Sequence, residues 1–97
     1  MYVASKHAVD GLTKSAALEA AEAGVRVNIV SPGPIQTGML DRFTGSDEGK
    51  AAFRSNVPLR RIGDPEEVAA AIVFVSSDKS SFLTGANIAV DGGLLAK

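Results

Sequence analysis

Residues 2–6 read YVASK and place the phenol of Tyr2 four positions before the ammonium of Lys6. Side chains at positions i and i+4 of a helix lie on the same face, so the two groups are expected to be neighbours. A nearby cation favours the phenolate and lowers the pKa of tyrosine from its usual value of about 10. The pair is therefore predicted to act as a general acid and base on an alcohol oxygen. Because Tyr and Lys also occur at this spacing by chance on surface helices, the prediction depends on the rest of the chain.

The segment around YVASK is predicted to be a helix over residues 2–23. It is rich in alanine, and small or apolar residues recur at steps of four, namely Ala8, Leu12, Ala16 and Ala20. Gly24 is of the type that usually follows a helix end. Gly11 in the interior costs about 1 kcal/mol relative to alanine, which predicts that another backbone approaches the helix there.

A short strand is predicted over residues 25–30, where β-branched residues are frequent. Asn28 within it is expected to be a structural hydrogen-bonding tie. The strand is expected to stop at SPGP, residues 31–34, because proline cannot donate to a sheet ladder. Ligands of open α/β sheets bind at the carboxyl ends of the strands, so residues 32–37 are predicted to face a ligand. The alternative is an ordinary turn that ends the strand and leads into a helix capped by Thr37.

The excursion over residues 38–56 is less regular and contains scattered glycines and charges. Short helices are expected around residues 39–43 and 48–55. Long segments of this kind inside compact domains are often lids. Met39, Leu40 and Phe43 are therefore candidates for the wall of a substrate pocket, and an amphipathic stripe packed on the core is an equal alternative.

A second helix is predicted to begin at DPEE, where Asp64 suits the N-cap, Pro65 the first helical position and Glu67 a capping box. The helix is expected to run to about residue 77, and a second strand follows over residues 87–90. Strand, helix and strand form one βαβ unit with parallel strands and a right-handed crossover. Two strands alone leave open sheet edges, which favour pairing with another chain.

Four sequences follow one another in the order and approximate spacing found in the short-chain dehydrogenase/reductases: YVASK, NIVSPGPIQT (residues 28–37), RIGDPEEV (61–68) and TGANIAVDGG (84–93). The chain resembles that family over essentially its whole length, and ASKHAV and SAALEAA resemble a subgroup often labelled glucose 1-dehydrogenase. The resemblance implies an α/β fold that is the C-terminal portion of a Rossmann-like, doubly wound parallel sheet. The dinucleotide-binding N-terminal half is expected to be absent, because the family's Gly-rich turn and catalytic serine precede its tyrosine and neither occurs in these 97 residues.

The resemblance implies NAD(P)-dependent hydride transfer between an alcohol and a ketone or aldehyde. Tyr2 would donate or accept the proton, and Lys6 would lower its pKa and hold the nicotinamide ribose. The residues implied to bind NAD or NADP are Lys6, Pro32, Gly33, Ile35 and Thr37, and the segment 38–56 would close over the substrate. Without the Gly-rich turn the chain alone is expected to be inactive. The alternatives are an interaction module that associates with full-length relatives, and a remnant without function.

Composition bounds the remaining function classes. The chain is 45% hydrophobic and 22% charged, which suits a single small domain over residues 1–97. A net charge of −1 gives no electrostatic case for nucleic acid or an anionic membrane, and the longest apolar run, residues 68–75, is too short to span a bilayer. The absence of cysteine excludes thiolate metal sites, and the single His7 is expected to be solvated or packed. We expect a cytoplasmic protein that forms homo-oligomers or associates with full-length relatives.

Overall fold

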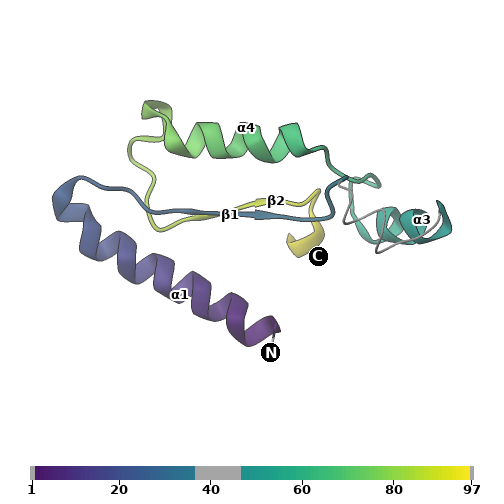
Figure 1. The fold of residues 1–97 in the computed structure, drawn as a ribbon, viewed down its shortest axis with the longest axis horizontal. Coiled ribbons are helices and arrows are strands. Elements are labelled where there is room, and N and C mark those ends of the chain that lie inside the picture. Colours follow the sequence, from purple (N-terminus) through teal and green to yellow (C-terminus); the bar gives the residue numbers. More distant parts are fainter. Residues whose placement is uncertain (1, 37–46, 97) are drawn as a thin grey trace.

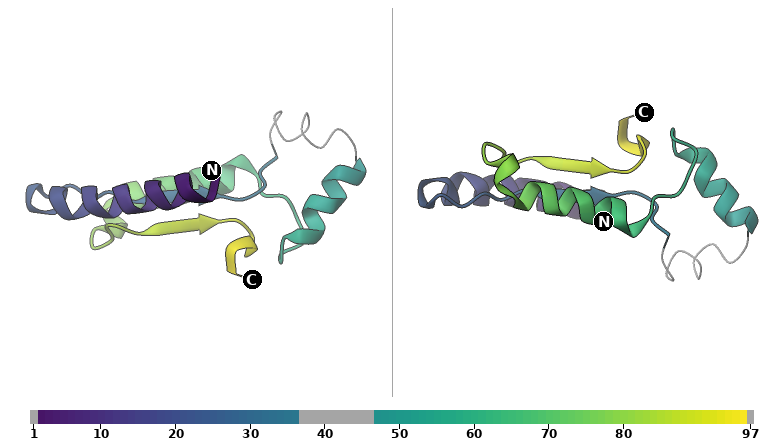
Figure 2. Two further views of the ribbon diagram at one scale, coloured as in Figure 1. Left: turned by 90° about the horizontal axis from the view of Figure 1, so that it is seen from below. Right: turned by 90° about the horizontal axis from the view of Figure 1, so that it is seen from above.

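The computed structural model describes residues 2–36 and 47–96, and of Tyr2 only the backbone. Two parallel strands form its centre, with α1 on one side and α4 on the other (Figure 1). Views from below and above show the same two helices on opposite faces of the sheet (Figure 2). The elements are α1 (Tyr2–Ala20), η1 (Ala21–Ala23), β1 (Ile29–Pro32), α3 (Asp47–Asn56), α4 (Pro65–Ser76), η2 (Asp78–Ser80), β2 (Asn87–Val90) and η3 (Leu94–Ala96). The predicted α/β class is confirmed.

The first predicted helix is confirmed as α1 followed by the short 3-10 turn η1. Gly24 ends it with a φ of 75°, and its N–H donates to the carbonyl of Ala21. This left-handed conformation is the one that favours glycine after a helix. The described residues do not supply the backbone that was expected near Gly11, because outside the helix's own backbone none of their atoms lies within 4 Å of the position that a Cβ would take.

The first strand begins later than predicted. Residues 25–28 precede β1 and are bound to the loop before β2: the N–H of Val27 donates to Oγ1 of Thr84 at 3.1 Å, and the N–H of Gly85 donates to the carbonyl of Val27 at 2.8 Å. The β-branched composition of this segment therefore marks extended backbone, while its hydrogen bonds come from a loop rather than from a strand.

Pro32 is the last residue of β1, where the sequence predicted that it would lie outside the sheet. It is paired in register with Val90 of the parallel strand β2. The N–H of Ile29 donates to the carbonyl of Ala86, directly before β2, at 2.8 Å, and the N–H of Gly33 donates to the carbonyl of Val90 at 3.0 Å. The nitrogen of Pro32 therefore faces the opposite edge of β1. The missing N–H of proline therefore costs this ladder nothing.

The second half of the βαβ unit follows the sequence closely. β2 has the predicted bounds, and α4 contacts both strands. The predicted helix over residues 48–55 is confirmed as α3, which lies beyond the carboxyl ends of the strands (Figure 1). The helix expected around residues 39–43 lies outside the described residues.

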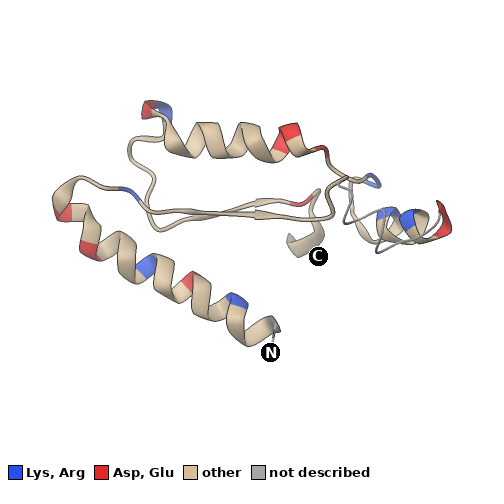
Figure 3. Cartoon of the chain, viewed as in Figure 1, with Lys and Arg blue, Asp and Glu red and all other residues tan. Residues whose placement is uncertain are grey.

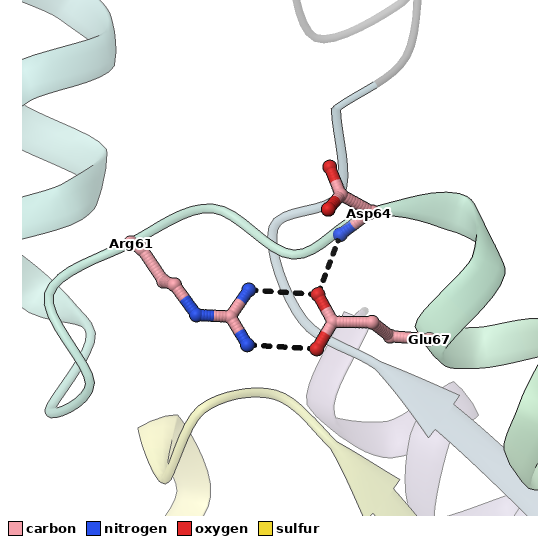
Figure 4. Close-up of polar contacts among 3 residues, drawn as sticks. All are labelled: Arg61, Asp64 and Glu67. Carbon is pink, nitrogen blue, oxygen red and sulfur yellow. Dashed lines mark hydrogen bonds and ion pairs between the residues drawn. The ribbon is translucent and has the colours of Figure 1, made fainter.

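α4 starts where the DPEE sequence predicted. Asp64 is its N-cap, and Oε1 of Glu67 accepts the N–H of Asp64 at 3.0 Å. Arg61 donates through both terminal nitrogens to the two carboxylate oxygens of Glu67, at 2.7 Å each (Figure 4). Hydrogen bonds from the Arg61 guanidinium, followed by the one from Asp64, lower the pKa of Glu67 from 4.5 to about 2. A bidentate ion pair between Arg61 and Glu67 thus adds to the N-terminal cap of α4.

The molecule is open for its size. Its radius of gyration is 15.6 Å, whereas a compact chain of about 100 residues has about 13 Å. Its accessible surface is 6842 Å², whereas about 5,200 Å² is typical of a folded protein of this mass. Among the described residues, Ala17 and Val57 are the buried apolar side chains. Much apolar surface therefore stays exposed to solvent.

Charges lie on the helices and loops, and the two strands carry none (Figure 3). Along α1 their sign alternates from Lys6 to Asp10 to Lys14, so the start of this helix offers no surface of one sign. None of the described helices combines the length and the apolar character that crossing a membrane requires.

Candidate functional site

Lys6 borders a cleft of about 580 Å³ at the end of the sheet where the carboxyl ends of both strands lie. We call it the Lys6 cleft. The segments that line it are the first turns of α1, the loop after β1, α3 and the loop after β2. Its lining residues are Val3, Lys6, His7, Pro32, Gly33, Pro34, Phe53, Asp91, Leu94 and Leu95.

The path of the chain explains why α1 contributes to this end of the sheet. α1 runs opposite to β1, because the chain reverses after Gly24 (Figure 1). The first turns of α1 therefore lie beside the last residues of β1. Lys6 also borders a groove of about 420 Å³ between α1 and β1, so its side chain lies where the helix and the strand end come together.

The structure brings together only part of the predicted site. Lys6, Pro32 and Gly33 line the Lys6 cleft. Ile35 instead lines a second cleft of about 460 Å³ on the side of Arg61, which we call the Arg61 cleft. Its lining residues are Pro34, Ile35, Pro58, Leu59, Arg61, Gly63, Glu67, Ala89, Val90, Asp91, Gly92 and Gly93.

The remaining predicted site residues are not located by the structure. Tyr2 is the first residue of α1, one helical turn before Lys6, and only its backbone is described. Thr37, Met39, Leu40 and Phe43 lie outside the described residues. Their roles stay predictions.

Ile35 is held away from the Lys6 cleft by pairing with the segment before α4. It forms an isolated parallel bridge with Gly63. The N–H of Gly63 donates to the carbonyl of Pro34 at 3.0 Å, and the N–H of Gln36 donates to the carbonyl of Gly63 at 2.8 Å. The chain after β1 therefore turns toward α4, which sequence spacing alone did not indicate.

Asp91 and Phe53 border the Lys6 cleft although the sequence did not single them out. Both oxygens of Asp91 accept backbone N–H groups, from Gly93 at 2.9 Å and from Leu95 at 3.1 Å, so this carboxylate caps the last turn. The rule that ligands bind at the carboxyl ends of parallel strands would have found Asp91, which directly follows β2. Phe53 lies on α3, and no local sequence signal places it here.

A polar contact inside the structure ties the two strands together. Oγ of the buried Ser31 donates to Oδ1 of Asn87 at 2.8 Å. On α1, Asp10 pairs with Lys14 at 3.1 Å. The hydrogen bond from Lys14 is the main cause that lowers the pKa of Asp10.

Asn28 is a structural tie, as predicted. Its Nδ2 donates to the carbonyl of Leu83 at 3.0 Å, and its Oδ1 accepts the N–H of Ala86 at 3.0 Å. Arg26 adds two bonds of 3.1 Å, to the carbonyls of Leu83 and Ser77. These side chains fix the segment between α1 and β1 against the loop before β2.

His7 is exposed, and its Nδ1 lies 2.8 Å from the carbonyl of Val3 one turn earlier in α1. It borders the Lys6 cleft. Over residues 2–36 and 47–96, no three His, Asp or Glu side chains come close enough together to hold a metal ion.

Comparisons with known proteins cover nearly the whole chain. The family described as Enoyl-(Acyl carrier protein) reductase matches residues 1–95. Cyclohexanol dehydrogenase of Acinetobacter sp. is 46% identical over 96 residues, which are 99% of this chain and 36% of that enzyme.

Two solved structures share the fold. A short chain dehydrogenase family protein of Francisella tularensis matches with a TM-score of 0.90 and 38% identity, over 99% of this chain and 43% of that one. 4-Hydroxyisoleucine dehydrogenase complexed with NADH matches with a TM-score of 0.90 and 38% identity, over 99% of this chain and 40% of that one. The chain thus spans well under half the length of these relatives.

The order of the motifs, the match over residues 1–95 and the shared fold agree with one another. The narrower likeness to glucose 1-dehydrogenases stays a prediction. The chain belongs to the short-chain dehydrogenase/reductase family, whose members are oxidoreductases that use NAD or NADP.

Proposed function

We propose that this chain supplies the proton-transferring and nicotinamide-facing part of an NAD(P)-dependent oxidoreductase that interconverts an alcohol and a ketone or aldehyde. The observation that supports it is the Lys6 cleft, where Lys6 meets Pro32 and Gly33 at the carboxyl end of β1. This is the place where open α/β sheets bind their ligands.

The cleft fits one end of a dinucleotide. A volume of about 580 Å³ lies within the range of about 300–1,000 Å³ that is usual for small-molecule sites. The ammonium of Lys6 suits hydroxyl oxygens of a ribose, because it can donate up to three hydrogen bonds. Within these 97 residues no Gly-rich turn is present for the pyrophosphate.

Tyr2 would transfer the proton, and the ammonium of Lys6 would lower the pKa of Tyr2 by favouring the phenolate. When bound, the nicotinamide would donate a hydride to the carbonyl carbon or accept one from the alcohol carbon. Pro32 at the end of β1 and Gly33 directly after it would position the nicotinamide. The assignment of Tyr2 rests on its place one turn before Lys6.

A chimera tests the assignment directly. The 96 residues of the Acinetobacter cyclohexanol dehydrogenase that match this chain are replaced by it, and cyclohexanol-dependent reduction of the dinucleotide is measured. Tyr2→Phe should lower the turnover by about 10²- to 10⁴-fold, the usual contribution of a general acid or base. Lys14→Ala is the control, because Lys14 lies on the same helix and pairs with Asp10. Full turnover by the Tyr2→Phe chimera would refute the proposal.

The 97-residue chain alone should show no steady turnover of NADH or NADPH. Oxyanion-site donors of the kind that the family's serine provides are worth about 3–4 kcal/mol each, and the 97-residue polypeptide of this assay does not include that serine. Turnover by the purified chain that disappears with Tyr2→Phe would contradict this expectation while supporting the role of Tyr2.

A second candidate function is association, either of the chain with itself or with a full-length relative. Its support is the exposed apolar surface of α1, where Leu12 and Leu18 are 70% and 78% exposed. Among the described residues, no strand pairs with the outer edge of β1. Such faces and edges favour association.

Light scattering at low micromolar concentration tests the association. Leu12→Ser should lower the measured mass, whereas Lys14→Ser on the same helix should leave it unchanged. A monomer of about 10 kDa at all concentrations would exclude self-association. The same measurement with added cyclohexanol dehydrogenase tests binding to a relative, and failure of both would favour the remnant without function.

A further inference from the structure

Residues 91–93, which we call the DGG turn, join two parts of the chain that are far apart in sequence. The N–H of Gly33, after β1, donates to the carbonyl of Val90 at 3.0 Å, directly before the turn. The N–H of Leu59, after α3, donates to the carbonyl of Gly92 at 3.1 Å. The turn therefore lies between the loop after β1 and the segment after α3.

The contact with the loop after β1 leaves no room for a side chain. A Cβ at Gly33 would lie 2.7 Å from Cβ and 2.8 Å from Cα of Asp91. Both distances are shorter than real Cβ atoms show, and one partner is a backbone atom that cannot turn aside. Gly33 is thus pressed against the first residue of the DGG turn.

The contact with the segment after α3 is equally close. A Cβ at Gly92 would lie 2.5 Å from Cγ1 of Val57. Val57 is 1% exposed, the lowest value among the described apolar side chains, so it has no free space into which to rotate. At Gly93 a Cβ would lie 3.2 Å from the ring of Pro58.

The DGG turn also separates the two clefts. Asp91 lines both the Lys6 cleft and the Arg61 cleft, while Gly92 and Gly93 line only the second. A displacement of the turn would move a wall of the Lys6 cleft as well.

We propose that the DGG turn is a positioning element: it is held between the segment 57–59 and Gly33, and so fixes the place of Asp91 in the wall of the Lys6 cleft. Gly92 is the positioning residue, because its missing side chain admits Val57. The inference rests on the proposed function only in taking the Lys6 cleft as the reaction site. The coupling between Gly92 and Gly33 is tested independently of the proposed function.

Amide hydrogen exchange and chemical shifts of the 97-residue chain, followed by NMR, test the coupling. Gly92→Ala should speed exchange about tenfold at Leu59 and also at Gly33, which contacts Asp91 rather than Gly92. Gly24→Ala is the matched control: Gly24 has a comparable φ of 75° against 64° for Gly92, but no atom lies within 4 Å of its Cβ position. Adding Val57→Ala to Gly92→Ala removes the methyl groups that clash and should restore slow exchange at Gly33.

A role limited to local structure would change Leu59 alone, so normal exchange at Gly33 in Gly92→Ala would overturn the proposal. The same changes in Gly24→Ala would overturn it too, since backbone strain would then explain them. If Gly92→Ala prevents folding, the double variant decides: refolding by Val57→Ala supports the contact, and failure to refold rejects it. None of these outcomes uses the dinucleotide, whereas loss of Tyr2 dependence in the chimera would reject the proposed function alone.

Discussion

Gly11 and Gly33 lie in opposite surroundings. Around Gly11, in the middle of α1, no atom of the described residues outside the helix's own backbone lies within 4 Å of the Cβ position, whereas at Gly33 the nearest atom is 2.7 Å away. The middle of α1 is thus not covered by other described residues, whereas the loops at the carboxyl ends of the strands are closely packed. Toward its C-terminal end α1 packs against the rest of the chain. There Ala17 is buried, and its Cβ lies 3.6 Å from the position that a Cβ would take at Gly85. The comparison shows that Lys6 lies on a loosely held helix and faces a firmly packed loop.

The largest effect is expected at the packed end. Gly33→Ala should destabilise the fold by about 1–3 kcal/mol, the usual cost of forcing an extra methyl group into a filled space. Urea unfolding followed by circular dichroism measures it, at one protein concentration because association adds to the apparent stability. An unchanged midpoint would show that the loop after β1 is as open as α1.

The second-largest loss of stability is expected for the hydrogen bonds that join the segment between α1 and β1 to the loop before β2. Asn28→Ala leaves the N–H of Ala86 without its partner, while the carbonyl of Leu83 keeps the bond from Arg26. An unmet group costs about 1–3 kcal/mol when buried, and because Asn28 is only half-buried we expect about 1–2 kcal/mol in the same assay. An unchanged urea midpoint would mean that the hydrogen bonds of Asn28 do not contribute to stability.

Features with a local cause could be predicted from sequence. The start of α4 follows from Asp64, Pro65 and Glu67, whose capping contacts span only three residues. Asn28 was recognisable because a polar group in an apolar segment needs partners. The start of β1 was missed because the bonds of Val27 come from a loop more than fifty residues away, and local composition does not encode such a partner.

The candidate site likewise contains parts that the sequence could predict and parts that it could not. The placement of Lys6 beside Pro32 and Gly33 follows from a helix that runs back along a strand, and the sequence predicted both elements. The family resemblance grouped Ile35 with them, whereas its bridge to Gly63 takes it into the Arg61 cleft. Long-range pairing, rather than residue type, decides such cases.

A substitution in the exposed middle of α1 is expected to stabilise the fold. Gly11→Ala should raise the free energy of unfolding by about 1 kcal/mol, because alanine loses less backbone entropy in a helix and the added methyl group meets no neighbour. The urea midpoint should therefore shift in the direction opposite to that of Gly33→Ala. A destabilised Gly11→Ala variant whose measured mass also falls would show that a second chain packs closely on α1.

The smallest change in stability is expected at the cap of α4, which lies neither in the exposed part of α1 nor in the packed loops after the strands. The pKa of Glu67 is lowered to about 2, first by Arg61 and then by the N–H of Asp64. Since the folded state prefers the carboxylate, this contribution is complete above the unfolded value of about 4.5 and disappears as the pH falls through about 2. Glu67→Gln keeps an amide oxygen for the N–H of Asp64 and removes the charge, and the side chains of the ion pair are about half exposed. The change should thus be smaller than that of Asn28→Ala.

Urea midpoints of the wild type and of Glu67→Gln should differ most at neutral pH and converge toward pH 2. Glu66→Gln, one residue earlier in the first turn, controls for the loss of a negative charge near the helix N-terminus, which is itself stabilising there. Added salt should shrink the Glu67 difference only in part, because two short hydrogen bonds to Arg61 hold the pair together. A difference that is the same at pH 7 and at pH 2 would mean that the carboxylate form does not matter, and that Glu67 stabilises α4 through shape and its bond to Asp64 alone.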